Sequence, residues 1–149
     1  MRRFVFRLER LLKLREEKER EQARGLGRAL RREEEHQLQR SHAEGNLSRC
    51  ANQIAEGMRG VVSAGTMGNL RIAFRAAAEG VEEANRSLQE AREEVRAERD
   101  RYTEARRDRR VLEKLREKGR ADHETRSARK EQSEMDEIAG RRRTEGRNR

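Results

Sequence analysis

The sequence contains no proline and no tryptophan, and aromatic residues make up only 3% of its 149 residues. Without proline, nothing in the backbone interrupts a long helix. With 32% apolar and 45% charged residues, the chain offers too little apolar surface for a compact globule of this size. Composition leaves a disordered chain or a long helical protein, and the abundance of Arg, Glu, Ala, Leu and Lys favours the helical one.

A single cysteine, Cys50, excludes an internal disulfide and is typical of a reducing compartment. We interpret it as a small core residue. No apolar stretch approaches the ~20 residues that span a bilayer. Arg7, Glu9 and Arg10 interrupt the apolar run near the start, so we expect neither a signal peptide nor a transmembrane segment. The sequence therefore predicts a cytoplasmic protein.

Apolar residues recur in alternating steps of four and three through the second half of the chain. This run begins at Leu70 and ends at Leu112, and only Glu98 and Arg109 interrupt it with polar side chains. Such a seam is the sequence signature of a coiled coil. The first half carries the same frame from Val5 onwards, with apolar residues at both ends and polar residues in the middle.

Three glycines, Gly60, Gly65 and Gly68, lie between the two halves, with Ser63 or Thr66 available as a helix N-cap. This pattern predicts a helix end followed by a helix start. A short connection between long helices makes them antiparallel neighbours. We therefore expect an all-α fold, a long antiparallel two-helix coiled-coil hairpin forming a single domain. Its expected parts are helix one at about 4–62, the turn at 63–68, helix two at 69–139 and a frayed basic tail at 140–149.

Folding the chain about this turn also predicts which seam residues meet. Large residues then face small ones, for example Phe74 over Gly57, as close packing favours. The same register sets Glu33 opposite Glu98, where we expect a loose, hydrated zone.

Catalytic chemistry has little support in the sequence. His36, His42 and His123 lack the spacing of three or four residues that a metal site on a helix requires. Gly25 and Gly27 lie within a helical pattern and no Lys-Ser/Thr follows them, so they are not a phosphate-binding loop. We predict no enzyme activity, no cofactor and no metal.

Three surfaces could bind partners. The apolar cluster at the N-terminus covers more than one helix face, so it is either the end of the core or a docking surface. The turn carries off-seam apolar residues that either pack on the turn itself or face a partner. The arginine-rich segments, including the tail, are either solvated faces or contacts for an acidic protein, nucleic acid or anionic lipid.

Patterns at both ends of the chain resemble the FliJ family of the bacterial flagellar export apparatus. The opening pattern is Phe4-x-Phe6-x-Leu8-x-x-Leu11-Leu12-x-Leu14-Arg15-x-x-x-Glu19. The closing pattern is Leu112-Glu113-Lys114-Leu115-x-Glu117-Lys118, followed by Glu131-x-x-x-Met135-Asp136-Glu137-Ile138-Ala139. Together with the length and the glycine-marked midpoint, the resemblance covers nearly the whole chain.

The resemblance implies a non-enzymatic, rod-like stalk similar to the gamma subunit of rotary ATP synthases. Its implied partners are the export ATPase hexamer, the cytoplasmic domain of the export gate and export chaperones. Its implied place is the cytoplasm, peripherally associated with the inner membrane at the flagellar base.

On this basis we expect the two ends of the chain to meet the ATPase, and the turn end to face the gate. The expected ATPase-binding residues are Phe4, Phe6, Leu8, Leu11, Leu12, Leu14, Leu112, Leu115, Met135 and Ile138. The expected gate-facing residues are Ile54, Met58, Val62, Met67, Leu70, Ile72 and Phe74.

Other readings remain open. One is the equivalent stalk of a virulence-type secretion system, and another is a generic basic coiled-coil scaffold. A third is a nucleic-acid binder, which would be non-specific, because 3% aromatics leaves almost nothing for base stacking and acids are interleaved with the arginines.

Overall fold

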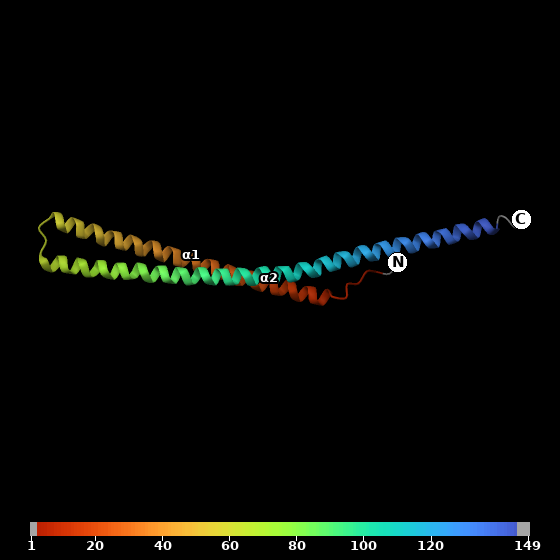
Figure 1. Ribbon diagram of the computed structural model, residues 1–149, viewed down its shortest axis with the longest axis horizontal. Helices are drawn as coiled ribbons and strands as arrows, with labels where there is room; N and C mark the ends of the chain where they lie inside the picture. Colours follow the sequence, from red (N-terminus) through yellow and green to blue (C-terminus); the bar gives the residue numbers. More distant parts are fainter. Residues whose placement is uncertain (1–2, 146–149) are drawn as a thin grey trace. The chain divides into compact units, whose positions relative to one another are not determined.

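The computed structural model describes residues 3–145, with side chains described as far as residue 140. Within that range the chain forms two long helices that pack against each other, and no strand. Helix α1 spans Glu9–Arg59 and helix α2 spans Ala64–Glu145 (Figure 1). The predicted all-α helical hairpin is confirmed.

The turn between the helices consists of residues 60–63. The Gly60 amide donates a hydrogen bond to the Glu56 carbonyl at 3.2 Å, which ends α1. Ser63 is the N-cap of α2, because its Oγ accepts a hydrogen bond from the Thr66 amide at 3.1 Å. No described residue has a positive φ, so the turn needs no left-handed glycine.

Several predicted boundaries differ from those observed. The turn lies at 60–63 rather than 63–68, because Ser63 rather than Thr66 caps the second helix. Helix α1 begins at Glu9 rather than near residue 4, and residues 3–8 are not helical. The frayed tail expected from residue 140 is helical as far as Glu145, because one glycine costs a helix only about 1 kcal/mol. Residues 146–149 lie outside the described range.

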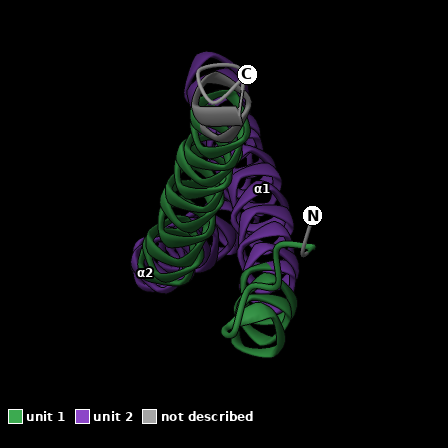
Figure 2. Ribbon diagram, turned by 90° about the vertical axis from the view of Figure 1, so that its right-hand side faces the viewer, with its two compact units in different colours: residues 1–19, 104–149 green, residues 20–103 purple. Residues whose placement is uncertain are grey.

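The chain is divided into two compact units (Figure 2). Unit 1 comprises residues 1–19 and 104–149, and unit 2 comprises residues 20–103. Each unit contains a stretch of α1 and a stretch of α2. The single domain expected from the sequence stays a prediction.

The core of each unit is a narrow seam. In unit 1 the buried apolar residues are Leu12, Ala105 and Leu112, and in unit 2 they are Ala29, Ala77, Leu88, Ala91 and Val95. All eight lie on the seam predicted from the sequence. The heptad frame was therefore predicted correctly in both helices.

The predicted pairing across the seam is wrong. A Cβ atom added to Gly57 would lie 3.2 Å from Met67 Cε and 3.6 Å from Leu70 Cδ1, whereas Phe74 was expected there. Glu33 pairs with Arg92 rather than facing Glu98. The observed partners in α2 lie roughly one heptad earlier than predicted, since the turn falls earlier. A shift of about seven residues keeps every seam residue on the seam, which explains why the frame is correct and the register is not.

Candidate interaction surfaces

A polar layer crosses the seam of unit 1. Arg109 of α2 forms a short ion pair with Glu19 of α1, and its Nη1 lies 2.5 Å from an Oε2 of Glu113. The hydrogen bond to Glu19, supported by the one to Glu113, raises the pKa of Arg109, although burial acts in the opposite direction. Next to this layer, Arg15 Nη1 donates to Asp108 Oδ2 at 2.8 Å. These side chains satisfy one another within the structure.

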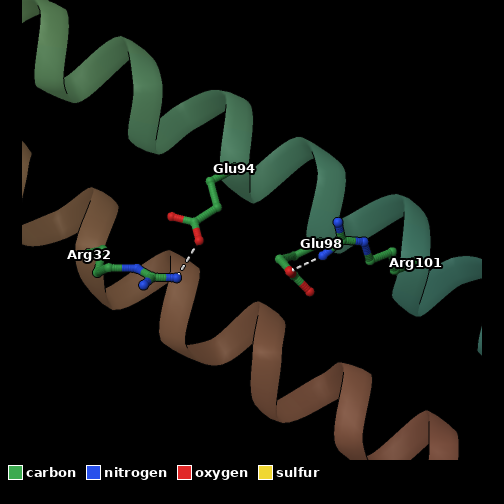
Figure 3. Close-up of polar contacts among 4 residues, drawn as sticks. All are labelled: Arg32, Glu94, Glu98 and Arg101. Atoms are coloured by element: carbon green, nitrogen blue, oxygen red, sulfur yellow. Dashed lines mark hydrogen bonds and ion pairs between the residues drawn. The ribbon is translucent and has the colours of Figure 1, made fainter.

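A second polar region lies in unit 2 (Figure 3). Arg32 of α1 reaches across to Glu94 of α2 at 2.5 Å, while Glu98 pairs with Arg101 on its own helix at 2.5 Å. The Glu98 side chain is only 16% exposed, because its carboxylate lies over Gly25, 2.9 Å from where a Cβ atom would be. Gly25 therefore makes room for a carboxylate within the seam.

This arrangement replaces the hydrated zone that was expected where Glu33 faced Glu98. Glu33 has an arginine partner, Arg92, at 3.5 Å, and Glu98 has Arg101. The two carboxylates are thus each neutralised by a cation of α2.

The residues expected to bind the ATPase divide into three groups by exposure. Leu12 is 0% exposed and Leu112 is 8% exposed, so both belong to the core. Phe4 and Phe6 are half-buried. The exposed members are Leu8, Leu11, Leu14, Leu115, Met135 and Ile138.

Four of these exposed residues belong to a surface that we call the apolar face. It consists of Leu8 just before α1, Leu11 and Leu14 from the start of α1, and Val111 and Leu115 from α2. Their exposed fractions are 41%, 39%, 60%, 53% and 47% in that order. Val111 was missed by the sequence analysis because it lies off the seam, although its position four residues before Leu115 places both on one side of α2.

The Arg15–Asp108 ion pair shows that both halves of the apolar face lie on the same side of unit 1. Arg15 follows Leu11 by four residues, and Asp108 precedes Val111 by three, so each shares a helix side with its neighbour. Because Arg15 and Asp108 are in contact, the leucines near the start of α1 and the apolar residues of α2 lie on either side of this ion pair.

The N-terminal segment before α1 is held against α2 by Phe4. The Phe4 ring lies over Gly119, with its Cζ 3.4 Å from where a Cβ atom would be, and its centroid is 5.7 Å from that of the His123 ring. An open hollow of about 430 Å³ lies beside the ring, lined by Phe4, Arg116, Glu117 and Arg120. Gly119 thus leaves space on α2 for an aromatic ring.

Beyond this contact, every described side chain of α2 from residue 128 to 140 is exposed. Met135 and Ile138 are 66% and 51% exposed. The side chains of the arginine-rich tail from residue 141 lie outside the described part of the chain.

The turn end of unit 2 is also apolar and incompletely covered. Met67, Val62 and Leu70 pack around Gly57, and these three residues and Ile54 are half-buried. The exposed apolar residues are Met58, Val61, Ile72 and Phe74, at 66%, 109%, 70% and 37%. Val61 is not among the gate-facing residues expected from the sequence.

Among the described residues, no group of three or more His, Cys, Asp and Glu side chains could hold a metal ion. None of the described helices is both long enough and apolar enough to cross a membrane. The features that remain are apolar surfaces at the chain ends and at the turn.

The fold and these surfaces define a class, a two-helix hairpin with exposed apolar surfaces that suit protein partners. Residues 4–147 match the family model described as Flagellar FliJ protein. The chain belongs to the FliJ family and is thus a component of the flagellar export apparatus. No curated protein and no solved structure matches it.

Proposed function

We propose that this chain is the non-enzymatic stalk of the export apparatus, which binds the hexameric export ATPase and couples it to the export gate. The observation that carries the proposal is the family match over residues 4–147. The exposed apolar face supports it, since residues near the N-terminus and residues of α2 contribute to one surface in unit 1.

In this proposal the ATPase contacts unit 1 through Leu8, Leu11, Leu14 and Leu115, together with Met135 and Ile138 further along α2. The exposed fractions of these side chains leave them available to a partner. Leu12 and Leu112 act indirectly, because they form the core that holds the two helices together.

The turn end would face the cytoplasmic domain of the gate. Among the described residues, the apolar side chains near the turn stay largely uncovered, and Met58 and Ile72 are the clearest examples. Export chaperones would be further partners. This role places the protein in the cytoplasm, peripherally associated with the inner membrane at the flagellar base.

The test uses the full-length chain and the purified export ATPase of the same organism. We expect the two proteins to co-purify and the ATP hydrolysis rate to rise several-fold when the chain is added. Met135→Ser/Ile138→Ser should lower the amount of ATPase that co-purifies and the ATP hydrolysis rate. Met58→Ser/Ile72→Ser should leave these two quantities unchanged and should reduce export in cells. Absence of both binding and stimulation with the unaltered chain would refute the proposed function.

A further inference from the structure

The apolar face of unit 1 lies among cations that form no ion pair with any other described residue. Three or four residues from Leu11, Leu14, Val111 and Leu115, on the same side of their helices, Arg15 and Asp108 pair with each other. The remaining charged side chains of α1 and α2 at those positions are Arg10, Glu17, Lys18, Arg107, Lys114 and Lys118, which form no ion pair among the described residues. Five of these six carry positive charge.

This imbalance is local. In unit 2 some of the exposed charges near the seam are paired across it, as in Arg32–Glu94 and Arg92–Glu33. The whole chain carries 29 acidic residues against 38 Lys and Arg, whereas the positions beside the apolar face, with Arg15 and Asp108 included, hold two acids and six bases. Close to an apolar surface, unpaired cations favour a partner of opposite charge.

The two helices also set the shape of the ligand. Apolar side chains of both helices lie on the same side of unit 1, and a third helix with its own apolar stripe packs well along two helices that lie side by side. An extended strand would find no unpaired backbone edge here, because the backbone of both helices is hydrogen-bonded internally.

We propose that the apolar face is a docking site for an amphipathic helix that carries acidic residues beside its apolar stripe. The site consists of Leu8, Leu11, Leu14, Val111 and Leu115, with Lys18, Arg107, Lys114 and Lys118 binding the flanking carboxylates. This inference deepens the proposed function. It rests on that function in one respect, because the helix is expected to belong to another protein of the export apparatus. It names the chemistry of the partner, which neither the family match nor the fold specifies.

The test uses the full chain and a fluorescein-labelled synthetic peptide of several heptads, with leucines on one face and glutamates on both flanks. Its counterpart has lysine in place of every glutamate. Fluorescence anisotropy should show saturable binding of the acidic peptide and none of the basic one. Leu11→Ser/Leu115→Ser should weaken binding at least about tenfold, which corresponds to about 1.4 kcal/mol.

Matched control variants distinguish binding at this site from non-specific binding to exposed apolar or charged side chains. Leu30 and Leu38 are exposed to 42% and 57%, close to the values for Leu11 and Leu115, and Leu30→Ser/Leu38→Ser should change binding less than about twofold. Likewise Lys114→Glu/Lys118→Glu should weaken binding at least about tenfold, while Arg96→Glu/Arg99→Glu should have little effect. If Leu11→Ser/Leu115→Ser loses helical circular dichroism, Leu14→Ser/Val111→Ser replaces it, since both of those side chains are more exposed.

Four outcomes would overturn the proposal. Equal binding of the acidic and basic peptides would show that the cations do not select the partner. Equal losses of affinity in the site and control variants would show that the peptide does not bind at the apolar face. Self-association of the chain that Leu11→Ser/Leu115→Ser abolishes would identify a second copy as the occupant. Duplex DNA binding that depends on Lys114 and Lys118 but not on Leu11 would assign the cations to nucleic acid. The peptide experiment contains no ATPase, so a negative result in it does not refute the proposed function. In the same way, a failure to stimulate the ATPase does not refute peptide binding at the apolar face.

Discussion

Glycines inside the helices differ in what lies opposite them. Gly27 has no atom within 4 Å of an added Cβ, whereas Gly25 faces the Glu98 carboxylate. Both lie in the interior of α1, where glycine costs about 1 kcal/mol relative to alanine. The two positions therefore have the same helix penalty and different surroundings.

We expect Gly27→Ala to raise the free energy of unfolding by about 1 kcal/mol, because it gains helix propensity and meets no obstacle. Gly25→Ala should gain less, because the added Cβ would lie 2.9 Å from Glu98 Oε2 and the carboxylate must move. Urea unfolding followed by circular dichroism measures both. A larger gain for Gly25→Ala would show that Glu98 does not occupy this position.

At the scale of the helices, a single hydroxyl decides where α2 begins. Ser63 Oγ accepts the Thr66 amide at 3.1 Å, so the helix starts at Ala64. Thr66 was an equally acceptable cap by residue type, and the sequence alone left the choice open. That choice moves the turn, and with it the partner of every residue on the seam.

Ser63→Ala should lower the free energy of unfolding by about 1 kcal/mol, because the cap of α2 is lost. Thr66→Ala should cost clearly less, because Thr66 contributes its backbone amide to the cap and its hydroxyl is exposed. Urea unfolding of the two variants under the same conditions measures the difference. If Thr66→Ala proved the more damaging substitution, the helix would start at the later position.

For the molecule as a whole, much of the fold followed from the sequence. Absence of proline and the heptad frame predicted two helices, and every buried residue of the described chain lies on the predicted seam. The register did not follow, because a shift of about one heptad also sets large residues against small ones. Val111 could not be predicted for a related reason. Residues that flank a seam can be assigned to a common surface only when the position of the partner helix is known.

A crosslinking experiment separates the two registers directly. In a Cys50→Ser background, Gly57→Cys/Met67→Cys should form a disulfide on mild oxidation, because a Gly57 Cβ would lie 3.2 Å from Met67 Cε. Gly57→Cys/Phe74→Cys tests the register expected from the sequence and should stay reduced. Met67 and Phe74 share a helix side and are about 10 Å apart along the axis. Non-reducing electrophoresis measures the disulfide, and preferential crosslinking of Phe74 would restore the earlier register.

The residue at the middle of the turn has a practical consequence. Val61 is fully exposed, and no residue of the turn needs a positive φ, so neither helix depends on the side chain at this position. A cysteine placed there in the Cys50→Ser background would carry an environment-sensitive fluorophore without disturbing the seam. The dye would report, in real time and during ATP turnover, when the turn end leaves water for the surface of another protein.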